Sequence, residues 1–181
     1  MVSPFLFFPG ERLSLAELTA ACLDGVLVAI GGGYMPADAV ETAWMRARSL
    51  APLTGRRLAA VRVSAAWVHG GVHAEPARHH LQRADQRRAR VPRDPRVIHH
   101  DALLDPADTV LIAGVSVSSP VRTMSDLARL DDAAEAGAWA RADPSLARQA
   151  REWLSRRPRL PYGRRAIALL TEALMTEATS E

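Results

Sequence analysis

The sequence contains neither lysine nor asparagine, and all 23 of its basic residues are arginines. Without lysine the chain cannot form a Schiff base, carry the lysine of a phosphate-binding loop or complete the lysine-bearing triad of many nucleases. It also lacks the nucleophile elbow, the Walker A and dinucleotide-binding glycine patterns and the HExxH zinc motif. We therefore expect no enzymatic activity, no cofactor and no catalytic residue.

Cysteine is almost absent as well. Cys22 stands alone, so the chain can form neither an internal disulfide nor a cysteine-based zinc site, and we expect a reducing compartment, the cytoplasm. We expect Cys22 itself to be a small core residue. No uncharged stretch approaches the roughly 20 residues that cross a bilayer, so no membrane span is expected. The 181 residues suffice for one medium or two small domains.

The arginines are unevenly distributed. Residues 78–96 carry seven arginines against two aspartates, and residues 151–165 carry six against Glu152, a local charge of +5 in each case. The first 53 residues carry a net charge of −2. Arginine forms bidentate contacts with phosphate, so the first cluster is a candidate nucleic-acid-binding arm; the alternative is a solvated loop. The candidate residues are Arg78, Arg83, Arg87, Arg88, Arg90, Arg93 and Arg96.

The N-terminal part shows a helix followed by a hairpin. Ser14 and Glu17 form a capping box at the start of a short amphipathic helix. The β-rich segment Val26–Ile30 is followed by the glycines 31–33, which predict a hairpin turn. A second capping pattern and one apolar face then predict a helix over Asp38–Leu50.

Short strands and then helices are expected beyond residue 54. Leu58–Val63 is typical of a strand, and Ser64 is placed to cap a short helix that ends near Gly70. Residues 83–95 are interpreted as an exposed loop. Further strands are expected at Arg78–Gln82, Arg96–His100, Thr109–Ala113 and Val115–Ser118, and helices at Ser119–Leu130, Asp131–Arg141, Pro144–Ser155 and Pro161–Ala178.

Three stretches, in this order, resemble a known family. They are Asp24–Asp38, Ser64–Gly71 and Val115–Leu130, the last reading VSVSSPVRTMSDLARL, and together they cover roughly residues 12–130. They are similar to the AbiEi antitoxins of type IV toxin–antitoxin systems. The resemblance implies a winged-helix domain joined to an α/β antitoxin domain. It also implies a DNA-binding repressor of its own operon, with a nucleotidyltransferase toxin as its functional partner.

The N-terminal part departs from this pattern. Only one helix fits before the hairpin, whereas helix-turn-helix readout needs two, and the hairpin tip is glycine rather than arginine. We therefore predict an α/β protein of the α+β type. A reduced winged-helix-like domain over residues 1–53 would precede a small mixed sheet with a helical C-terminal half over residues 54–181. Alternatively the hairpin packs on the following helix, with Tyr34 and Trp44 as core residues.

Arg122 and Asp126 lie four residues apart in the most specific stretch. An ion pair within the helix does not explain them, because arginine in a first turn opposes the helix dipole and arginine before aspartate is the weaker order. Two explanations of this pair remain: a buried salt bridge to another element of the fold, or a contact with a binding partner. Ser64 and Thr123 belong to the same motifs and have the same two interpretations.

All six histidines fall between residues 69 and 100: His69, His73, His79, His80, His99 and His100. One member of each adjacent pair could meet Asp101 at a metal, but the spacing matches no compact ligand motif, so no metal is expected. The acidic pairs Asp105/Asp108 and Asp131/Asp132 are interpreted as turn and cap residues.

These observations favour a non-catalytic regulator that resembles an AbiEi antitoxin and binds the duplex DNA of its own promoter through residues 78–96. The alternative is a protein-interaction module that has lost DNA binding and docks through the acidic N-terminal part and the helix of Trp44. A metal-dependent hydrolase that uses the histidines is a third possibility.

Overall fold

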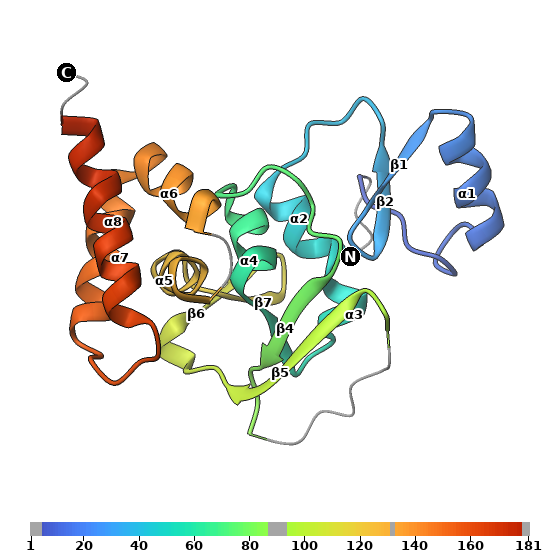
Figure 1. The fold of residues 1–181 in the computed structure, drawn as a ribbon. Coiled ribbons are helices and arrows are strands. Elements are labelled where there is room, and N and C mark those ends of the chain that lie inside the picture. Colours follow the sequence, from blue (N-terminus) through green and yellow to red (C-terminus); the bar gives the residue numbers. More distant parts are fainter. Residues whose placement is uncertain (1–4, 87–93, 131–132, 179–181) are drawn as a thin grey trace.

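The computed structural model describes residues 5–86, 94–130 and 133–178, and its mixture of helices and sheets is the expected α+β class. The N-terminal part, at one end of the molecule in Figure 1, begins with helix α1 (Leu15–Leu23). The predicted capping box is confirmed, since Ser14 N donates to Glu17 at 2.7 Å and Glu17 N donates to the Ser14 hydroxyl at 3.3 Å. Cys22 is only partly buried, because α1 buries Leu18 alone.

The predicted hairpin is confirmed. Strand β1 (Leu27–Ile30) pairs antiparallel with β2 (Gly33–Pro36). Helix α2 (Ala43–Ser49) starts five residues later than expected, because Thr42 rather than Asp38 caps it and accepts a hydrogen bond from Met45 N. A short helix α3 (Ala51–Thr54) follows. Trp44 is 45% exposed, so its placement in the core is wrong; α2 turns Met45, Ala47 and Ser49 inward instead.

Five strands form the central sheet: β3 (Leu58–Ala60), β4 (His79–Arg83), β5 (Val97–Leu103), β6 (Thr109–Ile112) and β7 (Val115–Ser118). Their order is β5-β4-β3-β7-β6, with parallel pairing for β4–β5 and β3–β7 and antiparallel pairing elsewhere. Helix α4 (Arg62–His69) lies between β3 and β4 in the chain, and a 3₁₀ turn η1 (Pro106–Asp108) precedes β6. The sheet is therefore mixed, as expected.

The C-terminal half is helical. Helices α5 (Pro120–Leu130), α6 (Ala133–Ala142), α7 (Pro144–Ser155) and α8 (Gly163–Ala178) pack together at one end of the molecule (Figure 1). Asp143 caps α7 through Leu146 N. Their shared core includes Met124, Trp139 and Leu170. Among the described helices, none combines the length and the apolar character needed to cross a membrane.

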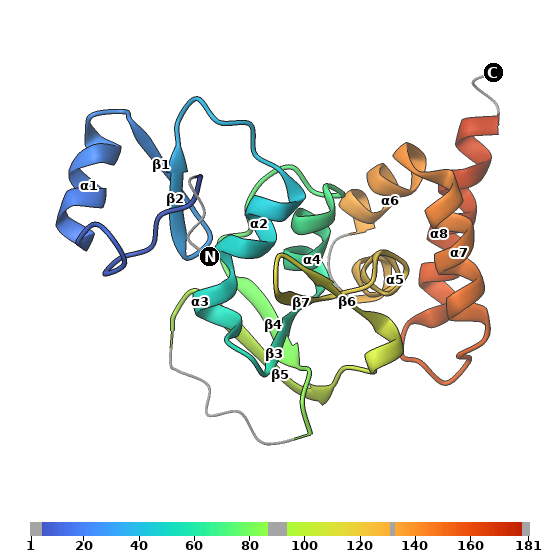
Figure 2. The same ribbon diagram turned by 180° about the vertical axis from the view of Figure 1, so that it is seen from behind.

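A second core cluster joins the N-terminal part to the sheet. Leu6, Ile30 and Met35 are buried in the same cluster as Leu58 and Leu81 of the sheet. Figure 2 shows α2 and α3 between the hairpin and the sheet. Apolar packing is thus continuous across residues 53 and 54, where the sequence suggested a boundary.

Candidate functional site

The most specific sequence motif forms the start of α5. The Ser119 hydroxyl accepts a hydrogen bond from Arg122 N at 3.3 Å, and Thr123 N donates to Ser119 O at 2.8 Å. Ser119 therefore caps α5, and Pro120 occupies the first helical position, as expected. Thr123 is fully buried and its hydroxyl lies 2.7 Å from the Ser118 hydroxyl, which fastens α5 to the end of β7.

Arg122 joins α5 to another element through two carboxylates. Its Nε donates to Asp126 Oδ2 at 2.7 Å, and its Nη1 donates to Asp108 Oδ2 of η1 at 3.1 Å. Asp126 also accepts from Arg129 at 3.2 Å. Burial alone would lower the pKa of Arg122, but Asp126 and Asp108 together raise it above its usual value. Of the two interpretations that the sequence left open, this geometry is that of a buried bridge.

Helix α7 completes this network with an aromatic residue. Trp153 Nε1 donates to Asp108 Oδ1 at 3.0 Å, and the Arg122 guanidinium carbon lies 5.4 Å from the Trp153 ring centroid. Asp108 does lie in a turn, as expected, since it ends η1 and its N–H donates to Asp105 O at 2.9 Å. Its carboxylate is also buried and accepts hydrogen bonds from two side chains, which the sequence did not indicate. Its neighbour Asp105 does cap η1, through Ala107 N. Neither Asp108 nor Trp153 could be assigned from sequence, because both lie far from Arg122 in the chain.

Ser64 lies at the start of α4 and ties that helix to the sheet. Its hydroxyl accepts a hydrogen bond from His80 N at 2.9 Å and its side chain is fully buried. It is not the cap residue that the sequence predicted, since Val61 occupies that position and makes no side-chain capping bond. The Ser-Ala-Ala motif thus marks the corner where strand β3 turns into α4.

Ser64, His79 and Glu75 form a row that resembles a catalytic triad. Ser64 Oγ lies 3.4 Å from His79 Nδ1, and His79 Nε2 lies 3.1 Å from Glu75 Oε1. The hydroxyl has no exposed surface and already accepts the His80 N–H, so no substrate can reach it. Packing of His79 against Trp67, with ring centroids 5.9 Å apart, further encloses the row. Its role in this fold is structural.

Glu75 also holds the tip of the N-terminal hairpin. Gly31 N donates to both Glu75 carboxylate oxygens, at 3.0 and 3.1 Å, and Arg96 Nη1 donates to Gly31 O at 3.4 Å. Gly32 N donates to Ser49 O of α2. Burial of Glu75 raises its pKa, but the hydrogen bonds from His79 and Gly31 outweigh burial, and the net pKa is lowered. The glycine tip is therefore fixed against α2 and the loop before β4.

The predicted phosphate-binding arm lies only partly within the described residues. Arg87, Arg88, Arg90 and Arg93 lie outside them. Arg78 donates to the carbonyls of Pro95 and Val97, and Arg83 donates to those of Asp101 and Gln86. Arg96 forms a bidentate pair with Asp94, with contacts at 2.9 and 3.2 Å. Arg78 directly precedes β4, Arg83 ends it, and Arg96 directly precedes the adjacent strand β5.

His79 and His80 of β4 lie on opposite faces of the sheet, as the alternation of side chains along a strand requires. His79 faces α4, whereas His80 Nδ1 lies 3.2 Å from His100 Nε2 on the neighbouring strand. Burial, followed by the charges of His100, Arg62 and Arg78, lowers the pKa of His80 to about 4. In the part of the chain that the structure describes, no three histidine, cysteine or acidic side chains are grouped so that they could hold a metal ion.

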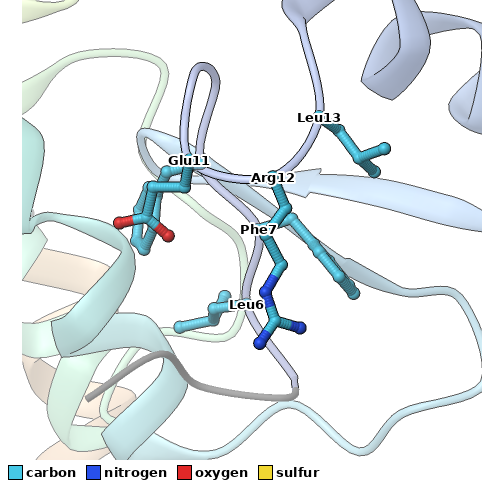
Figure 3. Close-up of a pocket in the computed structure, with 6 residues that line it drawn as sticks. Leu6, Phe7, Glu11, Arg12 and Leu13 are labelled. Carbon is cyan, nitrogen blue, oxygen red and sulfur yellow. The ribbon is translucent and has the colours of Figure 1, made fainter.

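Figure 3 shows a hollow in the N-terminal loop, away from these motifs. It is lined by Leu6, Phe7, Phe8, Glu11, Arg12 and Leu13. The hollow is too narrow to hold a water molecule and contains no histidine or nucleophile. It therefore offers no substrate site. The motif residues Ser64, Arg122, Thr123 and Asp126 instead hold elements of an α+β domain together.

Comparison with known families identifies that domain. The family model of the AbiEi antitoxin C-terminal domain matches residues 58–170, more than half of the chain. The chain therefore belongs to the AbiEi antitoxin family. No curated protein matches the sequence.

The match refines the extent of the resemblance. It contains the Ser-Ala-Ala corner and the Arg122 network, and it continues through α7 into α8. The resemblance seen in the sequence ended near residue 130, whereas the family match continues for 40 residues beyond it. The hairpin segment 24–38 lies outside the matched residues.

Proposed function

We propose that this AbiEi-family chain represses its own gene by binding the duplex DNA in front of it. It acts without catalysis or cofactor and opposes a nucleotidyltransferase toxin. Family membership supports the regulatory role in a toxin–antitoxin system. The DNA-binding part of the proposal rests on the basic segment of residues 78–96, which includes β4 and ends where β5 begins.

The described arginines of this segment suit phosphate contacts. Each guanidinium has five N–H donors. In Arg78 only Nε and Nη2 donate to backbone carbonyls, so further N–H groups are available to a phosphate. Because these hydrogen bonds hold the side chain in place, less rotamer entropy is lost when a phosphate binds. Arg78 and Arg96 are also exposed, which leaves them open to a ligand.

The reduced winged-helix-like part is assigned a structural role in this proposal. A wing contacts DNA through its tip, whereas here Gly31 and Gly32 donate their N–H groups to Glu75 and Ser49. The net charge of −2 over the first 53 residues also repels phosphate. We therefore place the main phosphate contacts in the arginine segment.

Fluorescence anisotropy with the upstream duplex and a scrambled duplex, each at several salt concentrations, tests the proposal. The parent protein should bind the upstream duplex more tightly. The triple variant R87A/R88A/R90A should reduce the slope of log affinity against log salt by about three units, near 0.9 for each lost phosphate contact. The matched control R12A/R56A/R141A removes the same charge elsewhere and should keep the slope. Equal slopes for all three proteins would exclude the arm.

A protein-interaction module remains the second candidate, and the exposure of Trp44 favours it. Val40 is 81% exposed and Trp44 is 45% exposed, next to the acidic Glu41. An exposed aromatic residue beside apolar surface is typical of interface hot spots. On this reading a partner co-purifies with the parent protein and is lost from W44A, while no duplex binds at low salt. Binding of the upstream duplex by W44A with parental affinity would favour the repressor.

A further inference from the structure

The outer side of the N-terminal part exposes a group of apolar side chains. In Figures 1 and 2, α1 lies at one end of the molecule, and the hairpin lies between it and α2. Helix α1 buries Leu18 alone. The large apolar residues that α1 and the start of the hairpin expose are Leu15, Leu23, Val26 and Val28, which together we call the α1–β1 surface. Exposed apolar surface of this kind is typical of an interaction site.

Strand β1 forms an open edge of the hairpin. On the other edge, Tyr34 of β2 exchanges backbone hydrogen bonds with Phe7, each at 2.9 Å, so the backbone groups of Tyr34 point away from β1. The residue opposite Tyr34 is Ala29. In such an antiparallel pair both residues point outward, so Ala29, and Leu27 two positions before it, turn their N–H and C=O groups away from β2. No described residue forms a hydrogen bond with these outward groups.

The β1 edge lacks the features that keep edge strands apart. Native edge strands are commonly protected by charged side chains, prolines or bulges. Strand β1 (Leu27–Ile30) contains no charged residue and no proline, and its register with β2 has no bulge. Val28 and Ala29, at its centre, are both exposed. By contrast, β5 at one edge of the central sheet carries Asp101, whose side chain is 94% exposed. The β1 edge is therefore open to another strand.

The hydrogen-bonding pattern of this edge is complementary to itself. When two β1 strands pair antiparallel about a two-fold axis at Val28, Leu27 of each copy lies opposite Ala29 of the other. Both residues turn N–H and C=O outward, so each of these pairs exchanges two hydrogen bonds. Val28 then lies opposite Val28 of the other copy, which is an apolar contact without like-charge repulsion. The pairing ends before Gly31, whose N–H is already bound by Glu75.

We propose that a second copy of this chain docks on the α1–β1 surface and that the two β1 strands pair antiparallel. The dimer then has a continuous sheet with two strands from each copy. Because the two-fold axis is perpendicular to this sheet, both α1 helices lie on the same face of it. Glu17 is the one charged residue of α1, so the two helices bring little like charge together. Burial of Leu23 and Val26 adds apolar stabilisation to the backbone hydrogen bonds.

Sedimentation equilibrium over a range of protein concentrations tests the dimer. The apparent mass of the parent chain should rise from 19.6 kDa towards twice that value as the concentration increases. The variant L23E should stay monomeric over the same range, because it places a like charge on both copies at the interface. Leu23 is 85% exposed, so the melting temperature of L23E should equal that of the parent chain. The matched control L111E, at a 72% exposed position on the edge strand β6, should keep the parental dimer.

A proline at position 29 tests strand pairing separately from the apolar contact. The variant A29P removes an N–H that points away from β2, so the hairpin keeps its own hydrogen bonds and circular dichroism should match that of the parent chain. Each dimer then lacks two hydrogen bonds, and the dissociation constant should rise by about tenfold or more. The control A29T keeps the N–H group and should associate as the parent chain does.

The outcomes decide between this surface and any other. A dimer that is weakened in L23E and A29P but kept in L111E and A29T supports the proposal. A parent chain that stays monomeric at every concentration overturns it. A dimer that L23E and A29P leave unchanged, or that L111E dissociates, also overturns it, because the interface then lies elsewhere. These measurements contain no DNA, so their result is independent of whether the chain is a repressor.

Discussion

At the scale of single residues, the family motif is a set of buried polar groups that satisfy one another. Asp126 is 2% exposed and accepts from both Arg122 and Arg129. Arg122 also donates to Asp108 of η1, which accepts from Trp153 of α7, so the network joins three elements. Such a network resists removal of a member because a charge is then buried without its partner.

Replacement of Asp126 by alanine should lower the free energy of unfolding by about 3 kcal/mol or more. The reason is that Arg129, whose side chain is 6% exposed, loses its carboxylate, and Arg122 keeps only one of two. Urea denaturation followed by circular dichroism measures the change. The exposed pair Arg156–Glu152 provides a control, because E152A should cost no more than about 0.5 kcal/mol. A similar small loss in D126A would contradict a stabilising network.

His80 makes stability depend on pH. Its pKa is about 4 in the folded chain and about 6.5 when unfolded, so between these values the unfolded state binds the extra proton. The stability that neutral His80 contributes to the folded state is fully present above pH 6.5, and it is lost as the pH falls to about 4. Because His80 is only half-buried, solvent screening limits it to about 1 kcal/mol. Denaturation of H80Q at pH 7 and pH 5 should show a weaker pH dependence than the parent protein; parallel curves would refute this.

At the scale of elements, the hairpin is positioned by its tip. Gly31 has a φ of +56°, and a Cβ at this position would lie 2.3 Å from Ser49 Oγ. Its N–H is bound by Glu75. Gly31 and Gly32 therefore also permit a close approach of the turn to the end of α2, and Gly33 permits a close approach to Phe8.

The variant G31A should lose more stability than G25A. Both glycines have positive φ, and each substitution costs about 1–2 kcal/mol for the left-handed backbone. Nothing lies within 4 Å of a Cβ on Gly25, so only G31A also displaces Ser49. Hydrogen exchange should report faster exchange in β1 and β2 of G31A. Equal losses of unfolding free energy in the two variants would mean that the contact between the hairpin tip and α2 does not contribute to stability.

At the scale of the whole molecule, the N-terminal part and the antitoxin domain share a core. Leu6 and Ile30 are buried in the same cluster as Leu81 and Val117. Met45 of α2 and Leu50, which directly follows that helix, belong to the same cluster. Removal of residues 1–53 would therefore uncover apolar surface of the sheet rather than separate two self-contained units.

A fragment of residues 54–181 tests this directly. We expect it to unfold at a lower urea concentration than the full chain and to bind a hydrophobic dye such as ANS, because the cluster around Leu58 and Val117 loses its cover. The full chain should unfold in one transition. A fragment as stable as the full chain, without dye binding, would show that residues 54–181 fold as an independent domain.

Local features of the fold could be predicted from the sequence because they depend on neighbouring residues. The capping box of Ser14 and Glu17, the hairpin at Gly31–Gly33 and the cap of α5 at Ser119 all involve groups a few positions apart. The start of α2 was missed because Asp38 and Thr42 offer competing caps in the same short stretch, and only Thr42 is used.

The sequence by itself determined the α+β class, the order of most elements and the residues of the motifs, since propensity, capping and apolar periodicity act over short distances. Only the tertiary structure decided which distant residues these motif residues contact. Asp108 and Trp153 reach Arg122 from η1 and α7, and Glu75 reaches Gly31 across 44 positions of the chain. Those choices depend on how the elements pack, because a buried charge or N–H must find a partner wherever the fold supplies one.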